Sequence, residues 1–317
     1  MTRRTEHTLQ VDGLSIAVTE WGEPNVPDAP AVVMLHGIRG YAETFVHVAQ
    51  ALQPQRRVIA FDQRGRGRSD WDPQRRYVTA TYVADLLAVA DQLGLARFDL
   101  LGHSMGGINA IVFSSTYPTR VRRLLIEDAG PGAFEHSPGA GRIKRELEQT
   151  PAGFESWEAA SAYMRALRPS VPEAARQQRL QEMLRPRRAE EGAGFTWRYD
   201  LAGIAAVRLN PDPAQVVDLA PHVRSLACPT LVVRGGRSDY LQPDMAQAMA
   251  DANPRLRWME IADAGHYVHD DQPEVFHRVA REFLLEEAAD AGAPSGSTEA
   301  DAAPGAGRAA AGSGAAS

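Results

Sequence analysis

Short apolar runs alternate with amphipathic stretches along most of the chain. Helical periodicity is found around residues 42–52, 79–93, 105–117, 243–251 and 273–287. The apolar runs between these stretches predict eight strands, at residues 8–11, 15–21, 31–35, 58–61, 98–101, 123–126, 230–233 and 256–261. Such alternation is typical of an α/β fold, with a mostly parallel sheet and helices on both faces. Asp12-Gly13 is a two-residue hairpin signal, so we expect the first two strands to be antiparallel.

The alternation of strands and helices stops between Pro131 and about Pro221. Prolines interrupt this segment repeatedly, and its amphipathic stretches predict helices at residues 142–149, 157–167 and 173–184. We interpret the segment as a helical cap inserted after the sixth strand.

The predicted organisation has four parts. The first part of the sheet core covers residues 1–131, the cap 132–221, and the second part of the core 222–286. Residues 287–317 are rich in Ala, Gly, Ser and Pro and lack periodicity, which predicts a disordered tail.

The composition is that of an ordinary soluble globular protein, with 44% hydrophobic and 23% charged residues among 317. A formal net charge of −6 gives no reason to expect nucleic-acid binding. Cys228 is the only cysteine, which excludes an internal disulfide and disfavours a cysteine metal site. The sequence shows no signal-peptide pattern and no run of about 18 apolar residues that could cross a membrane. We expect a cytoplasmic protein that acts on a small-molecule substrate without a nucleic-acid or membrane partner, and we leave a homodimer open.

The most informative motif is Gly102-His103-Ser104-Met105-Gly106, which fits the pattern G-x-S-x-G. A predicted strand precedes it and a predicted helix follows it. A serine on such a connection is lifted above the sheet on a strained backbone. Glycines are expected on either side because a Cβ there would collide with the adjacent strand or helix. The motif therefore predicts that Ser104 is a catalytic nucleophile.

Two other glycine-containing turns follow predicted strands. In His36-Gly37-Ile38, the backbone N–H of Ile38 can point at the space above Ser104 and form an oxyanion hole with the N–H of Met105. His36 has no second ligand at metal-binding spacing, so we interpret it as a structural hydrogen-bonding residue. Residues 62–69 lack the Gly-Lys-Ser/Thr ending of a P-loop, which indicates a tight structural loop.

A serine nucleophile needs a base, and His266 is the candidate. It follows the last predicted strand, so the base comes after the serine in chain order. His269 is close enough in sequence to compete, but it lies a turn beyond the strand end. We therefore predict His266 as the base, and we predict no metal site and no cofactor.

Two carboxylates compete to orient the base. Asp239 follows the seventh predicted strand, and Asp128 stands at the end of the sixth, beside the strand that leads to the nucleophile. We favour Asp128, with Asp239 as the alternative acid. A plain turn-capping role before Pro131 is the competing interpretation of Asp128.

Together these motifs resemble the α/β-hydrolase fold family over about residues 8–286. The resemblance implies an eight-stranded sheet, a cap after the sixth strand, and a Ser/acid/His mechanism that passes through an acyl-enzyme. The family's nucleophile maps onto Ser104 and its base onto His266. The commonest acid position maps onto Ser238, which is a departure from the family pattern. Members with the acid after the sixth strand, similar to the zearalenone-lactone and (acetamidomethylene)succinate hydrolases, match at Asp128.

The expected function is hydrolysis of an ester or amide-type bond in a small molecule. The alternatives are a C–C bond hydrolase of the meta-cleavage-product type, a small-molecule receptor and a cofactor-free perhydrolase on the same fold. Three arginines of the cap could bind a substrate carboxylate: Arg142, Arg145 and Arg165. Ion pairing with nearby glutamates on the solvent side is the plainer interpretation of each.

Overall fold

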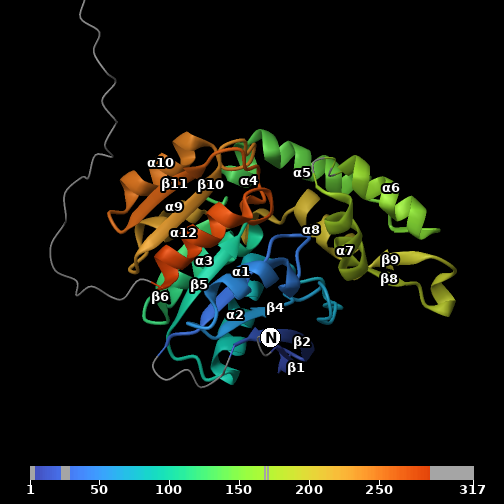
Figure 1. Cartoon of the computed structure of the whole chain (residues 1–317), viewed down its shortest axis with the longest axis horizontal. Coiled ribbons are helices and arrows are strands. Elements are labelled where there is room, and N and C mark those ends of the chain that lie inside the picture. Colours follow the sequence, from blue (N-terminus) through green and yellow to red (C-terminus); the bar gives the residue numbers. More distant parts are fainter. Residues whose placement is uncertain (1–3, 23–28, 168, 170, 286–317) are drawn as a thin grey trace, which may run out of the picture. The chain divides into compact units, whose positions relative to one another are not determined.

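An eight-stranded sheet forms the centre of the computed structural model, which describes residues 4–22, 29–167, 169 and 171–285 (Figure 1). The strands are β1 (Arg4–Val11), β2 (Leu14–Trp21), β3 (Val32–Leu35), β4 (Val58–Phe61), β5 (Phe98–His103), β6 (Val121–Glu127), β10 (Thr230–Gly235) and β11 (Leu256–Ile261). Their spatial order is β1-β2-β4-β3-β5-β6-β10-β11. β2 runs antiparallel to β1 and β4, and the other neighbouring strands are parallel. The predicted α/β fold is confirmed, while the predicted tail lies outside the described residues.

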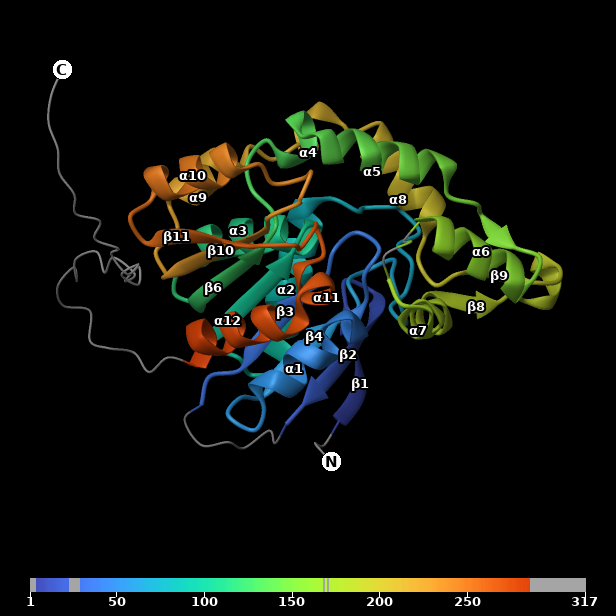
Figure 2. The same ribbon diagram turned by 45° about the horizontal axis from the view of Figure 1, so that its top comes forward.

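Helices cover both faces of the sheet (Figures 1 and 2). One face carries α1 (Val46–Leu52) and α12 (Pro273–Leu285). The other carries α2 (Thr79–Gln92), α3 (Met105–Thr116), α9 (Leu219–Arg224) and α10 (Pro243–Ala252). Successive residues of β3 serve the two layers in turn, since Val33 packs on the α3 side and Met34 on the α12 side. Burial on both faces explains why the strands are continuous apolar runs.

The segment between β6 and β10 is built differently. Its helices are α4 (Ala133–His136), α5 (Pro138–Gln149), α6 (Trp157–Leu167), α7 (Glu173–Met183) and α8 (Leu201–Leu209). A small antiparallel sheet, in the order β7-β9-β8, consists of β7 (Gly153–Phe154), β8 (Leu184–Pro186) and β9 (Phe195–Trp197). The stretches predicted as helices coincide with α5, α6 and α7, whereas the small sheet and α8 were not predicted.

This inserted segment packs on the loops that follow β3 and β5. Trp197 and Tyr199 share an apolar cluster with Tyr82 and Met105 of the sheet core, and Ile38 packs against it. Residues on both sides of the boundaries predicted at 131 and 221 belong to one compact unit, so these boundaries stay predictions. Among the described helices, none is long and apolar enough to cross a membrane.

The loop after β4 contains a buried ionic cluster. The guanidinium of Arg64 donates from Nε to Asp85 and from Nη1 to Asp72, each at 2.6 Å, and all three side chains are almost fully buried. Gly65 and Gly67 have φ of 77° and 57°, which favours glycine there. Arg64 therefore ties the loop both to its own Asp72 and to Asp85 of α2.

Loss of one carboxylate from this cluster should destabilise the fold. We expect Asp85→Ala to lower the free energy of unfolding by about 3 kcal/mol, because a buried guanidinium loses one of its partners. Asp91→Ala is the matched control on the same helix, because Asp91 pairs with Arg120 at an exposed site. There we expect a change of about 0.5 kcal/mol or less. Urea unfolding of both variants measures the difference, and equal losses would contradict the assignment.

Candidate active site

Ser104 lies on a sharp turn between β5 and α3. Its φ of 52° and ψ of −118° are strained for a residue with a side chain. A Cβ on Gly102 would overlap the carbonyl of Gly106, and a Cβ on Gly106 would overlap the carbonyl of Leu35. The glycine spacing read from the sequence is therefore what allows this turn to form.

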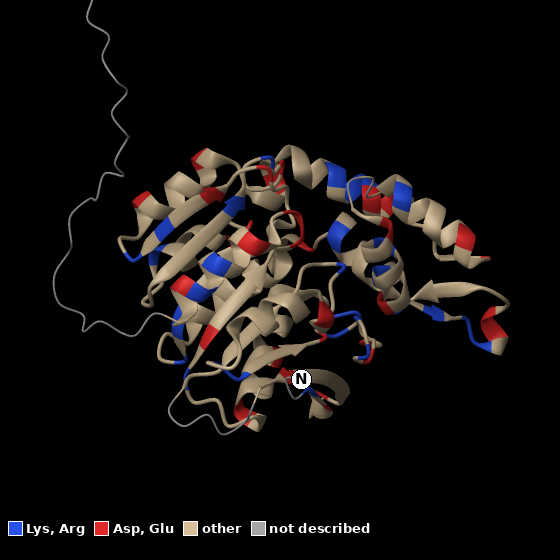
Figure 3. Ribbon diagram, in the orientation of Figure 1, with Lys and Arg blue, Asp and Glu red and all other residues tan. Residues whose placement is uncertain are grey.

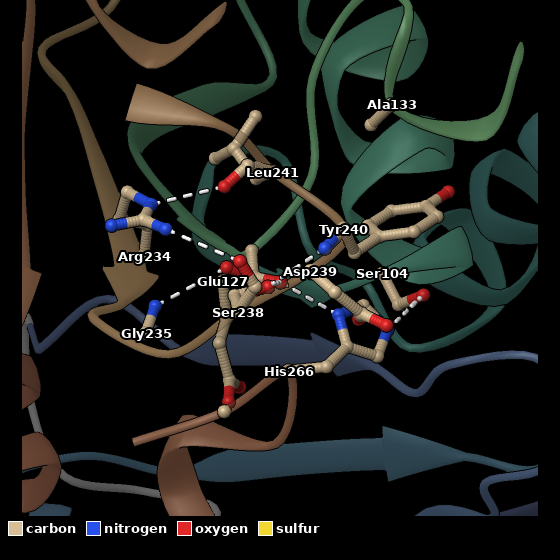
Figure 4. Close-up of polar contacts among 12 residues, drawn as sticks. Ser104, Glu127, Ala133, Arg234, Gly235, Ser238, Asp239, Tyr240, Leu241 and His266 are labelled. Atoms are coloured by element: carbon tan, nitrogen blue, oxygen red, sulfur yellow. Dashed lines mark hydrogen bonds and ion pairs between the residues drawn. The ribbon is translucent and has the colours of Figure 1, made fainter. Parts of the chain in front are cut away.

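Ser104, His266 and Asp128 form a hydrogen-bonded series. Figure 4 shows Ser104 against the imidazole of His266. The Ser104 hydroxyl donates to Nε2 of His266 at 2.9 Å, and Nδ1–H of His266 donates to Oδ2 of Asp128 at 2.7 Å. Ser104 begins α3, Asp128 follows β6, and His266 lies in the loop after β11. All three residues are buried: Ser104 is 4% exposed, His266 8% and Asp128 0%. The hydrogen bonds fix the imidazole tautomer in which Nε2 can accept a proton.

The carboxylate of Asp128 is held by the loop after β10. Its Oδ2 accepts from the Ser238 hydroxyl at 2.5 Å, and its Oδ1 accepts from the N–H of Gly235 at 3.2 Å. Burial raises the pKa of Asp128 to about 7, and these two hydrogen bonds oppose that rise. Ser238 stands where the family's commonest acid would stand, and here it binds the acid that comes from β6.

The carboxylate of Asp239 is engaged by an arginine of the inserted segment. It binds the guanidinium of Arg142, with distances of 2.8 and 2.9 Å to Nε and Nη2. The structure thus brings Asp128 within hydrogen-bonding distance of His266, and its role as the acid stays a prediction.

The two expected oxyanion donors lie next to each other. The guanidinium of Arg66 donates from Nε to the carbonyl of Ile38 at 3.0 Å and from Nη2 to the sulfur of Met105 at 3.3 Å, so one side chain contacts both residues. Within the described residues, the N–H groups of Ile38 and Met105 have no hydrogen-bond partner. Their role as oxyanion donors stays a prediction.

The other histidines near the site have structural contacts. His103 hydrogen-bonds through Nε2 to the carbonyl of His266 at 3.0 Å, and burial lowers its pKa to about 3, so it is the neutral ring that holds the base loop. His36 accepts from the N–H of Gln63 at 3.0 Å, which agrees with a hydrogen-bonding role. His269 binds Glu127 at 2.7 Å. Among the described residues, no cluster of three or more His, Cys, Asp or Glu side chains could hold a metal ion.

A cavity of about 780 Å³ lies beside the triad, between the sheet core and the inserted segment. Gly37, His103 and Tyr267 line its inner end, whereas Ser104 is not among the lining residues. The hydroxyl of Tyr199, another lining residue, is buried without a partner in the described structure. The cavity thus reaches the neighbours of the triad and stops short of the nucleophile.

The three candidate substrate-binding arginines lie outside this cavity. Arg142 is engaged by Asp239 and Glu146, Arg165 is exposed and contacts Glu173 at 3.3 Å, and Arg145 is exposed. Basic and acidic residues are interspersed along the helices of the inserted segment (Figure 3). Substrate binding by these three arginines stays a prediction.

Sequence reasoning did not single out Arg66 or Arg208. A detectable signal existed for Arg208, because it is the only charged residue in the otherwise apolar stretch 201–209. Arg66 gave no such signal, since it is one of three arginines in the loop at 62–69.

Comparison with known proteins identifies the family. A family model described as the alpha/beta hydrolase fold matches residues 30–273. A Bacillus subtilis protein, provisionally named a 2-succinyl-6-hydroxy-2,4-cyclohexadiene-1-carboxylate synthase, is 32% identical over 86% of this chain and 96% of its own. The 3-hydroxybutyrate-oligomer hydrolase of Cupriavidus necator is 30% identical over 79% of this chain and 86% of its own. The crystal structure of E-2-(acetamidomethylene)succinate hydrolase superposes with a TM-score of 0.77 at 24% identity, covering 90% of this chain and all of that one. The chain therefore belongs to the α/β hydrolase fold family, and it is a hydrolase.

Proposed function

We propose that this protein cleaves an ester or amide-type bond of a small-molecule substrate through a covalent acyl-enzyme on Ser104. The observation that carries the proposal is the unbroken hydrogen-bond series from Ser104 through His266 to Asp128. A serine in this setting is activated by a neutral imidazole, which a carboxylate holds in the required tautomer.

In the first half of the reaction, Nε2 of His266 takes the proton of Ser104 as Oγ attacks the substrate carbonyl. The carbonyl electron pair moves to oxygen, and the N–H groups of Ile38 and Met105 stabilise the oxyanion. The pair then re-forms the carbonyl, the bond to the leaving group breaks, and His266 returns the proton to that group.

Water completes the cycle. His266 removes a proton from a water molecule whose oxygen attacks the acyl carbonyl, and a second oxyanion forms in the same place. Its collapse breaks the bond to Oγ, and Ser104 regains its proton from His266. The imidazolium that forms twice per cycle is stabilised by the carboxylate of Asp128, which Ser238 and Gly235 keep in position.

Narrower expectations belong to the same proposal. Residues 132–221 act as a cap over the site, since their aromatic side chains pack on Met105. The reaction needs neither metal nor cofactor, because the triad supplies both nucleophile and base. We place the enzyme in the cytoplasm without nucleic-acid or membrane partners, and sedimentation velocity would distinguish a monomer from a homodimer.

A fluorophosphonate probe tests the proposal directly. We expect the probe to label the native protein at Ser104, because the activated hydroxyl attacks phosphorus as it would attack a carbonyl. Ser104→Ala should abolish labelling and reduce ester turnover by at least about 10⁴-fold. Mass spectrometry of the labelled peptide identifies the site. Absence of labelling in the folded native protein would overturn the serine-hydrolase assignment.

The acid is tested by a matched pair of substitutions. We expect Asp128→Asn to lower kcat by about 10⁴-fold, because the amide no longer fixes the imidazole tautomer or stabilises its charge. Asp239→Asn, which removes the charge opposite Arg142, should cost less than about tenfold. The opposite order of effects would assign the acid to Asp239.

The acid limb of the pH profile should reflect the Asp128–His266 pair. Since burial raises the pKa of Asp128 to about 7, kcat/KM should fall as the pH drops through about 7 and stay level above it. Ser238→Ala removes a hydrogen bond that lowers this pKa, so the limb should move to higher pH. Ser115→Ala, whose hydroxyl contacts His222 away from the triad, is the control. An unmoved limb in Ser238→Ala would contradict this role of Ser238.

A further inference from the structure

A second cavity, of about 240 Å³, lies one helical turn from the nucleophile. Ile108 of α3 lines it and donates its N–H to the carbonyl of Ser104 at 3.0 Å. Gly130, two residues after Asp128, lines it as well. The inserted segment closes the other side with Phe134 and Arg208.

Arg208, near the end of α8, is the unusual residue of this cavity. Within the described residues, its guanidinium makes no hydrogen bond and no ion pair. It lies 5.4 Å from the centre of the Phe134 ring, and burial lowers its pKa. Arg142 and Arg165 of the same segment are instead paired with carboxylates. Arg208 is partly buried. A cation that has lost part of its hydration and has no bound anion is stabilised when a ligand supplies the counter-charge.

Tyr240 shares an apolar cluster with residues beside this cavity, and it also contacts the triad. The ring of Tyr240 packs on the ring of His266 with centres 4.6 Å apart. Tyr240 also belongs to an apolar cluster against which Ile38, Phe134 and Leu209 pack, so the oxyanion turn and the Arg208 region meet at one side chain. Burial raises the pKa of Tyr240, and the charge of Arg208 opposes that rise. Arg208 therefore acts electrostatically on a residue in direct contact with the catalytic base.

We propose that Arg208 binds a carboxylate of the substrate in this cavity while the scissile carbonyl lies at Ser104. The substrate class is then an ester or amide-type compound that bears a free carboxylate. A guanidinium offers two parallel N–H donors that match the two oxygens of a carboxylate. This inference rests on the proposed serine-hydrolase function and narrows its substrate.

The surrounding charges favour a monoanion. Lys144, the only lysine of the chain, lines the cavity 5.3 Å from the Phe134 ring centre and makes no ion pair in the described structure. Glu135 and Asp212 also line the cavity, and both are exposed. The two exposed carboxylates repel a phosphate dianion more strongly than a monoanion, and the planar carboxylate group matches the fork of Arg208.

Paired substrates test this assignment. The 4-nitrophenyl hemiesters of succinate, glutarate and adipate carry a carboxylate on the acyl side, and their methyl esters lack it. 3-Acetoxybenzoate and its methyl ester make the same comparison on the leaving-group side. We expect the acid to exceed its methyl ester in kcat/KM by about 10- to 100-fold in at least one pair, as a charge-assisted hydrogen-bonded contact provides. In Arg208→Gln, this ratio should fall to about threefold or less.

Arg185→Gln is the matched control, because Arg185 lies in the same segment and is paired with Glu191 outside both cavities. It should keep the native ratio. Native protein that turns over the methyl esters with no preference for the acids would overturn the inference and leave the serine hydrolase standing. A native ratio retained in Arg208→Gln would also overturn it. Failure of every ester together with absence of fluorophosphonate labelling would instead remove the proposed function.

Binding and stability provide readouts that do not depend on turnover. In Ser104→Ala, glutarate or the preferred hemiester should raise the melting temperature, and the added Arg208→Gln change should abolish that shift. Without ligand, Arg208→Met should keep or raise the melting temperature, because it removes an unpaired, partly buried charge. A lowered melting temperature in Arg208→Met, with the ligand shift retained in Ser104→Ala/Arg208→Gln, would show that Arg208 only packs against Phe134.

Discussion

The turn at Ser104 sets the position of every other group in the site. A left-handed φ on a residue with a Cβ costs about 1–3 kcal/mol, so the turn must be imposed by its surroundings. The imposing contacts are the packing of α3 on the sheet, where Ile111 and Phe113 are fully buried, and the approach of Gly106 to the carbonyl of Leu35. Because α3 begins this close to the end of β3, the N–H of Met105 lies next to the turn that contains Ile38. The strain that brings the hydroxyl of Ser104 to His266 and the closeness of Met105 to the Ile38 turn have the same cause.

Asp128 and His266 follow different strands of the sheet, β6 and β11, and β10 lies between these two strands. β6 and β11 are both neighbours of β10, so Asp128 and His266 approach from either side of the loop that follows it. That loop contributes the N–H of Gly235 and the hydroxyl of Ser238 to the carboxylate. A carboxylate buried at 0% exposure needs such donors to remain charged beside the imidazole. Ser238 therefore stands in the loop after β10 where the family's commonest acid would stand, and its hydroxyl binds Asp128, the carboxylate that comes from the end of β6.

The strands of the sheet could be predicted from the sequence because most of them are buried on both faces. Such strands are continuous apolar runs, which stand out between amphipathic helices. The sequence was also sufficient for Ser104 and His266, whose positions follow from short motifs at strand ends. The choice between Asp128 and Asp239 could not be made from the sequence, since a one-residue difference in a turn decides where a carboxylate points. The small sheet and α8 escaped prediction because strands of two or three residues and a short apolar helix carry little periodicity. The surroundings of Arg208 depend on contacts between α8, α4 and the loop after β10, which no local pattern encodes.

Three buried or partly buried arginines show how the fold distributes positive charge near the nucleophile. The charge of Arg64 is neutralised by Asp72 and Asp85, so Arg64 stabilises the loop after β4. Arg66 lies two residues later and is fully buried. Among the described residues it donates only to neutral acceptors, which include the carbonyl of Ile38 and the hydroxyl of Tyr82. Its charge is therefore not cancelled locally, and it acts on the region where negative charge develops on the substrate oxygen. Arg208 adds a second uncancelled charge on the far side of Tyr240. A substrate that brings one carboxylate to Arg208 satisfies that charge in the ground state and leaves the field of Arg66 directed at the oxyanion, so binding and catalysis use separate cations.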